Sequence, residues 1–149
     1  MSAGSEEDGA RIVVGVDGSD SSKDALAWAV RQAALTGAVV EAVTAWQIPT
    51  YYGFAVTDDA PDFKQLAVSM LEEAIAAASG LAPDVLIRPV VAEENAARAL
   101  LDAAKGADLL VVGSRGHAGF TEALLGSVGQ YCVHHAKCPV VVVPHRHAH

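Results

Sequence analysis

Aromatic residues are scarce in this sequence, since they make up only 5% of its 149 residues. Its core therefore has to be built from Ala, Val and Leu, and a hydrophobic content of 52% excludes a disordered chain. Basic residues are also few: 10 stand against 18 acidic ones, which gives a formal net charge of −8. This balance excludes a broad positive surface for a nucleic acid polymer, so an anionic ligand has to be bound by local geometry.

The sequence also lacks a signal peptide and a membrane segment. Residues 1–10 contain no basic region followed by apolar residues, as a secretory signal requires. The apolar runs are far shorter than the ~20 residues of a membrane helix. These absences predict a cytoplasmic protein with no membrane contact. The length predicts a single domain over residues 11–144, with a disordered leader at 1–10 and a tail at 145–149.

Two cysteines are too few for a disulfide framework. We expect Cys132 and Cys138 to be reduced, buried thiols, with a redox pair as the alternative. The tail at 145–149 contains three histidines, which could bind a metal by composition. A solvated tail is the favoured interpretation, because nothing upstream in the sequence supplies converging ligands.

Strand and helix patterns alternate along the whole chain. Short β-branched runs predict five strands, at 12–17, 39–46, 84–92, 108–113 and 139–143. Helical spacing, N-cap residues and terminal glycines predict helices from Ser19 to Thr36, over 63–79, over 95–105 and over 126–136. Strands that are apolar throughout and separated by helices indicate an α/β fold. We expect a single doubly wound five-stranded parallel sheet of order 3-2-1-4-5, with helices on both faces.

Two of these elements carry more detailed expectations. Pro89 cannot donate a hydrogen bond to a neighbouring strand, so the third strand is expected either to lie at an edge of the sheet or to kink locally. The second helix is expected to bury one face of apolar residues at 3,4-spacing: Phe63, Leu66, Ala67, Met70, Leu71, Ala74, Ala77 and Ala78.

An open sheet of this order binds ligands where the winding reverses, between the carboxyl ends of the first and fourth strands. The sequence becomes unusual at that point, because Gly113 is followed by Gly116 and, after nine intervening residues, by Gly126-Ser127. Glycines permit close approach to the backbone and turns that direct N–H groups at an anion, and a helix start favours phosphate. Simple turns and caps are the alternative interpretation. A Walker A loop and a dinucleotide fingerprint are both absent.

The Gly-x-x-Gly-x9-Gly-Ser pattern resembles the ATP-binding motif of the universal stress protein family. The opening strand IVVGVDGS and the closing segment HAKCPVVVVP resemble the same family, so the likeness spans about residues 10–144. It implies a Rossmann-like fold of the adenine nucleotide alpha hydrolase type. It also implies a bound adenine nucleotide: ATP first, with AMP or cyclic AMP as alternatives and Mg²⁺ as a counter-ion of ATP.

The resemblance also implies which residues bind. The adenine pocket would comprise Gly15, Val16, Asp17 and Thr44; the ribose and phosphates would lie at Gly113, Arg115 and Gly116; and the phosphate tail would lie at Gly126, Ser127 and Val128. Asp17 has an alternative role, as a cap of the turn that follows it. The sequence departs from the family at Glu94 and Ala96, where members often carry Gly-x-Pro, and Glu94 adds negative charge near the ribose edge.

The valine run of the fifth strand is expected at the other sheet edge. An exposed apolar edge favours pairing with another chain, so Val140, Val141, Val142 and Val143 are expected to form a homodimer interface. The family resemblance implies the same mode of association.

A binding module is favoured over an enzyme, with slow ATP hydrolysis as the most that is expected. Phosphoryl transfer needs metal-holding acids and a base, and the loop offers only Arg115, Ser127 and Glu122. A phospho-receiver domain would need a Lys after the fifth strand, which is missing, and a scaffold without nucleotide would not need the glycine pattern. Tyr51 and Tyr52 lie in a loop that could form a lid, a partner surface or a cover for the second helix.

Overall fold

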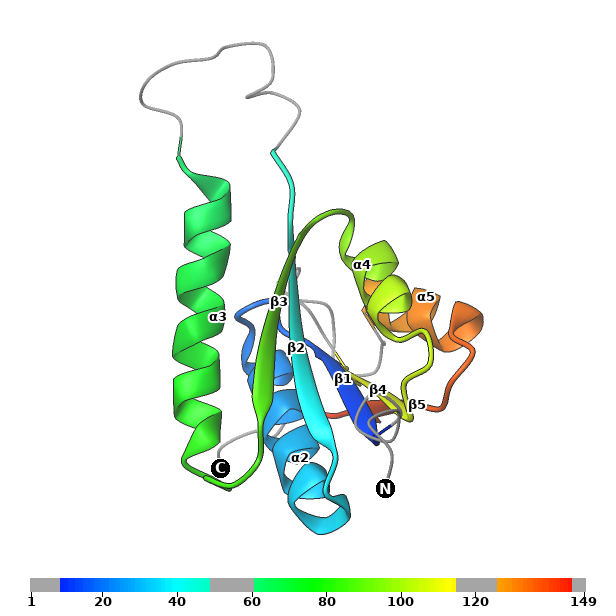
Figure 1. Ribbon diagram of the computed structural model, residues 1–149. Helices are drawn as coiled ribbons and strands as arrows, with labels where there is room; N and C mark the ends of the chain where they lie inside the picture. The colour runs from blue at the N-terminus through cyan, green and yellow to red at the C-terminus, as the bar shows by residue number, and fades with distance from the viewer. Residues whose placement is uncertain (1–8, 49–60, 115–125, 146–149) are drawn as a thin grey trace.

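The computed structural model describes residues 9–48, 61–114 and 126–145, which form a parallel sheet with helices on both faces (Figure 1). The strands are β1 (Arg11–Gly15), β2 (Val39–Trp46), β3 (Ile87–Glu93), β4 (Leu109–Gly113) and β5 (Val140–Val143). The helices are α2 (Asp20–Thr36), α3 (Phe63–Ser79), α4 (Ala96–Ala103) and α5 (Ser127–His135). The sheet order is β3-β2-β1-β4-β5 with parallel pairing throughout, so the predicted fold class and both predicted edge strands are confirmed.

Each face of the sheet has its own small-residue core. Helices α2 and α3 cover one face, and α4 and α5 cover the other (Figure 1). Under α2 and α3 the core contains Val14 and Val40 from the strands and Leu26 and Leu71 from the helices. Under α4 and α5 it contains Val13, Leu110, Leu100 and Cys132. Alanines and further valines fill most of the remaining positions, which explains how the fold forms with so few aromatic residues.

The helix ends follow local sequence signals. Ser19 caps α2, Asp62 caps α3 and Asn95 caps α4, each by accepting a hydrogen bond from a backbone amide three residues later. Gly37 ends α2 with a φ of 80°, a left-handed conformation that favours glycine. No helix in the described parts of the chain is long and apolar enough to cross a bilayer.

Two details of the prediction were wrong. Helix α3 buries Ala67, Leu71, Ala74 and Ala78, whereas Leu66 is 60% exposed and Ala77 is also exposed. The reason is that α3 packs at one side of the sheet, against α2, β2 and β3, and only one narrow stripe of it is covered. Strand β3 begins at Ile87 rather than at residue 84, because its pairing with β2 starts with Ile87 opposite Val40.

Candidate functional site

Two strand ends and two helix starts meet at the carboxyl edge of the sheet. Strands β1 and β4 are neighbours, and they end at Gly15 and Gly113. Helix α2 begins five residues after Gly15, and Ser127 begins α5 beyond the glycine-rich segment. This edge is the point at which the winding of the sheet reverses, and there the structure brings together the predicted residues that it describes.

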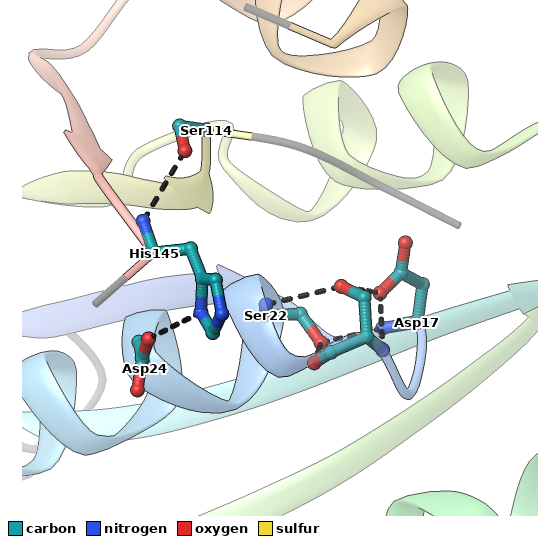
Figure 2. Close-up of polar contacts among 6 residues, drawn as sticks. Asp17, Ser22, Asp24, Ser114 and His145 are labelled. Atoms are coloured by element: carbon teal, nitrogen blue, oxygen red, sulfur yellow. Dashed lines mark hydrogen bonds and ion pairs between the residues drawn. The ribbon is translucent and has the colours of Figure 1, made fainter. Parts of the chain in front are cut away.

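Serines and an aspartate form the hydrogen bonds that hold the turn between β1 and α2. The Asp17 carboxylate accepts hydrogen bonds from the Ser19 amide at 2.9 Å and from the Ser19 hydroxyl at 2.5 Å. The Ser19 hydroxyl oxygen accepts from the Ser22 amide at 3.1 Å, and the Ser22 hydroxyl lies 3.2 Å from the Asp17 amide (Figure 2). The turn-capping role that was the alternative for Asp17 is therefore present. The carboxylate itself remains solvent-exposed.

Val16 and Thr44 form a buried bridge behind this turn. The Thr44 hydroxyl donates to the Val16 carbonyl at 2.8 Å, and the Val16 amide donates to the Val43 carbonyl at 2.8 Å. Both side chains are buried, and Val16 packs in the core under α2 and α3. These contacts fix the path of the chain as it leaves β1. The two buried residues therefore hold the exposed turn at Asp17 in place.

Both strand-end glycines are closely packed, and at Gly113 the packing leaves no room for a side chain. A Cβ on Gly113 would lie 2.4 Å from the Ser21 hydroxyl oxygen and 2.8 Å from Ser21 backbone atoms. A Cβ on Gly15 would lie 2.9 Å from a Leu100 methyl carbon. The absence of a side chain at Gly113 therefore lets the first turn of α2 approach β4. The sequence alone offered the approach of a ligand or a simple turn as the reason for this glycine, and not the packing of a helix.

Ser114 connects three elements through its backbone. Its amide donates to the Val143 carbonyl at 2.9 Å, and its carbonyl accepts from the Gly126 amide at 2.9 Å. The end of β4, the end of β5 and the start of α5 are thus joined at one residue. Sequence reasoning passed over Ser114, because backbone bonds leave no side-chain signal between Gly113 and Arg115.

Helix α5 begins without a side-chain cap of its own. Its N-cap is Gly126, which is buried and has no side chain to accept a hydrogen bond. Ser127 is exposed at the first helical position, and Val128 packs partly into the core under α4 and α5. The first turn carries no acidic residue. The positive end of the helix dipole at Ser127 therefore meets neither an acidic side chain of its own first turn nor a capping side chain on Gly126.

The buried thiol of Cys132 packs the middle of α5 against the sheet. Cys132 is fully buried, and burial, with a smaller contribution from Cys138, raises its pKa from 9.0 to about 11. Cys138 is only partly buried, and the desolvation of its thiol is the main reason why its pKa is raised. The expectation of two buried thiols is thus correct for Cys132 and too strong for Cys138.

Glu94, which departs from the family pattern, bonds to its chain neighbour Asn95 and to the end of β2. Its carboxylate accepts from the Asn95 amide at 3.0 Å, and its own amide donates to the Trp46 carbonyl at 3.1 Å. Arg115 and Gly116, predicted to bind the ribose and phosphates, lie outside the described residues, as do Tyr51 and Tyr52.

His145 is a residue at this edge that sequence reasoning had assigned to the tail. Its ring Nδ1 lies 3.0 Å from the Asp24 carboxylate of α2, and its amide lies 3.4 Å from the Ser114 hydroxyl oxygen (Figure 2). These contacts join residues 121 and 31 positions apart, so no local pattern could have revealed them.

Comparisons with known proteins agree with this architecture. The model of the universal stress protein family matches residues 10–144. A universal stress protein of Mycobacterium tuberculosis is 35% identical over 136 residues, which are 89% of this chain and 44% of the relative. A universal stress protein of Mycolicibacterium smegmatis is 32% identical over 139 residues, with 89% and 47% covered. The chain thus spans about half the length of these curated relatives.

Solved structures give the same result. A universal stress protein in complex with cAMP has a TM-score of 0.63 and 33% identity, covering 90% of this chain and 95% of that chain. A universal stress protein family protein from Arabidopsis thaliana with AMP bound has a TM-score of 0.64 and covers 92% of both chains. Its identity of 20% supports the fold alone.

Proposed function

Because this chain belongs to the universal stress protein family, we propose that it is a binding module for an adenine nucleotide, held at the carboxyl ends of β1 and β4. The site would comprise the described residues Gly15 to Asp17, Thr44, Gly113 and Gly126 to Val128, together with Arg115 and Gly116. The family member in complex with cAMP, 33% identical over most of this chain, supports the nucleotide class.

The start of α5 is the observation that carries the proposal. The Gly126 amide is fixed to Ser114 at the tip of β4, so the first turn of α5 is held beside the switch point of the sheet. Gly126 supplies no capping side chain and the first turn holds no acidic group. Such a helix start favours a phosphate, whatever the net charge of the protein.

Within this class, we favour ATP over AMP and cyclic AMP. The glycine pattern from Gly113 to Ser127 has the spacing of the ATP-binding motif that it resembles. Mg²⁺ would then enter as the counter-ion of ATP. We propose a regulatory role for the bound nucleotide, with hydrolysis slow at most.

Calorimetry with ATP, AMP, cyclic AMP and adenosine tests the proposal, and Ser127→Glu supplies the decisive variant. A carboxylate at the first position of α5 favours the helix but repels a phosphate. We expect binding of ATP to weaken about tenfold or more, since about 1.4 kcal/mol of repulsion equals a factor of ten. Adenosine has no phosphate, so its binding should be unchanged by this substitution.

Gln65→Glu is the matched control, because it adds the same charge to the first turn of α3, on the other face of the sheet. It should leave the affinity for every ligand unchanged. Equal loss in both variants would mean that net charge, and not the start of α5, controls binding. No binding of any adenine nucleotide by the unaltered protein would refute the proposed function itself.

We also propose that two copies pair through the edge strand β5. The carbonyls of Pro139 and Val143 accept bonds from β4, so alternation leaves the backbone of Val140 and Val142 directed at the open edge. Val142→Pro removes an outward donor and keeps the bonds to β4, so gel filtration should show a monomer. Val142→Thr retains the N–H and should remain dimeric, and a dimeric proline variant would contradict this interface.

A further inference from the structure

The residue that follows the family match is fixed to the first helix. His145 lies one position beyond the matched range of 10–144. Its ring Nδ1 is 3.0 Å from an oxygen of Asp24, which lies in the second turn of α2. Figure 2 shows the imidazole extending from the end of β5 to this carboxylate. The pair therefore ties the exit of the last strand to α2.

The same residue contacts the entry to the glycine-rich segment. The His145 amide donates to the Ser114 hydroxyl over a long 3.4 Å, and Val143, two residues earlier, accepts from the Ser114 amide at 2.9 Å. Ser114 is thus held from the β5 side at both its side chain and its backbone. On its other side, its carbonyl accepts from the Gly126 amide that begins α5.

Helix α2 supports this arrangement at two points. Its first turn lies directly against Gly113, where a Cβ would be 2.4 Å from the Ser21 hydroxyl oxygen. One turn later Asp24 contacts His145. The end of β4 and the exit of β5 are consequently fixed to the same rigid helix, and Ser114 lies between the two attachments.

We propose that the His145–Asp24 pair positions Ser114, and through it the start of α5, for the nucleotide phosphates. His145 and Asp24 are positioning residues, which act on the ligand through Ser114 and Gly126. This inference rests on the proposed function, since it concerns the affinity of that same site. It assigns a role to a residue outside the span that the family shares.

The expected change in nucleotide affinity follows from how exposed the two side chains of the pair are. The side chains of His145 and Asp24 are 23% and 36% exposed, so solvent screens their attraction. Partly exposed pairs of this kind change an equilibrium by a factor of up to about five. We therefore expect a change in affinity of about threefold to fivefold, with the fold intact.

A double-mutant cycle tests the pair, with ATP affinity measured by calorimetry. His145→Gln and Asp24→Asn should each weaken binding about threefold to fivefold, and the double variant should be no weaker than either one. His145→Arg presents N–H donors to the Asp24 carboxylate and should restore most of the affinity. In the Asp24→Asn background the arginine should restore nothing, which a merely space-filling role would not predict.

Asp20→Asn is the matched control, because it removes the same charge from the exposed first turn of the same helix. Its affinity should equal or slightly exceed that of the unaltered protein. Additive losses in the cycle, or an equal loss in the Asp20 variant, would overturn the positioning role.

Hydrogen exchange in the free protein separates this proposal from the proposed function. The Ser114 amide, bonded to Val143, should exchange about threefold to fivefold faster in His145→Gln and in Asp24→Asn than in the unaltered protein. That result without any nucleotide binding would leave the pair as a structural contact and refute its role at the site. Unchanged exchange would refute the positioning of Ser114, even if the nucleotide binds as proposed.

Discussion

Two helices begin at the same edge of the sheet, and they begin in opposite ways. At the start of α2, the Ser19 hydroxyl oxygen accepts from the Ser22 amide, Asp17 bonds to Ser19, and Asp20 places a carboxylate in the first turn. At the start of α5, the capping position is Gly126 and the first turn has no acidic residue. The start of α2 has a capping side chain and an acidic residue that offset its positive dipole end, whereas the start of α5 has neither of them.

The difference supports the proposal that this acidic protein binds an anion. Both helices begin at this edge with amides that have no acceptor within the helix, and with a positive dipole end. The serines and aspartates of α2 satisfy its own start, so an incoming phosphate has little to gain there. In the proposed function, the first-turn amides of α5 bind the phosphate instead. The net charge of −8 does not prevent this, because the helix dipole acts locally, within about one turn of the helix end.

The largest expected effect comes from a substitution that separates the start of α2 from the end of β4. Gly113→Ala would place a Cβ within 2.8 Å of the Ser21 backbone, so α2 has to move away from β4. We expect the free energy of unfolding to fall by about 2–3 kcal/mol, as overpacking does in a rigid core. Urea denaturation followed by circular dichroism measures this loss.

Gly37→Ala provides the comparison for that experiment. Gly37 has open space around its Cβ position but a φ of 80°, so alanine there costs backbone strain and no collision. The expected loss is about 1–2 kcal/mol. If Gly113→Ala were as stable as the unaltered protein, the close packing of α2 on β4 would be wrong.

A smaller effect comes from removing the cap of α2. Ser19→Ala deletes the oxygen that accepts from the Ser22 amide, and N-cap serines of this kind contribute about 1 kcal/mol. The same denaturation measurement should show that loss. Ser19→Thr retains both the acceptor for the Ser22 amide and the hydroxyl donor to Asp17, so it should restore the stability. A full loss in the threonine variant would contradict the capping role of this hydroxyl.

Much of the fold could be predicted from the sequence, because local patterns determine it. Apolar strand runs such as 109–113 and caps such as Asn95 and Gly37 act within a few residues, and the right-handed crossover rule then restricts the order of the strands. The exposed Leu66 was missed because periodicity shows which residues could form a face, but not how wide a stripe the neighbours cover.

The sequence predicted the position of the candidate site in the fold, but few of the contacts that form it. Topology located it between β1 and β4, and the glycine spacing indicated phosphate. The packing reason for Gly113, the backbone role of Ser114 and the His145–Asp24 pair all join segments far apart in the sequence. Contacts of this kind depend on the packed structure and have no local sequence signal.

A pH-dependent effect distinguishes the start of α5 from its buried middle. Its start offers no titrating side chain in the first turn, whereas Cys132 lies buried one turn later with a pKa raised from 9.0 to about 11. Because the folded state holds this proton more tightly than the unfolded state, the stabilisation is complete below pH 9 and is lost as the pH rises towards 11. Denaturation at pH 8, 9.5 and 10.5 should show the unaltered protein losing more stability than Cys132→Ala. Parallel pH profiles would show that the thiol ionises as easily in the folded protein as in the unfolded one. That result would contradict the burial of Cys132, which distinguishes the middle of α5 from its exposed start.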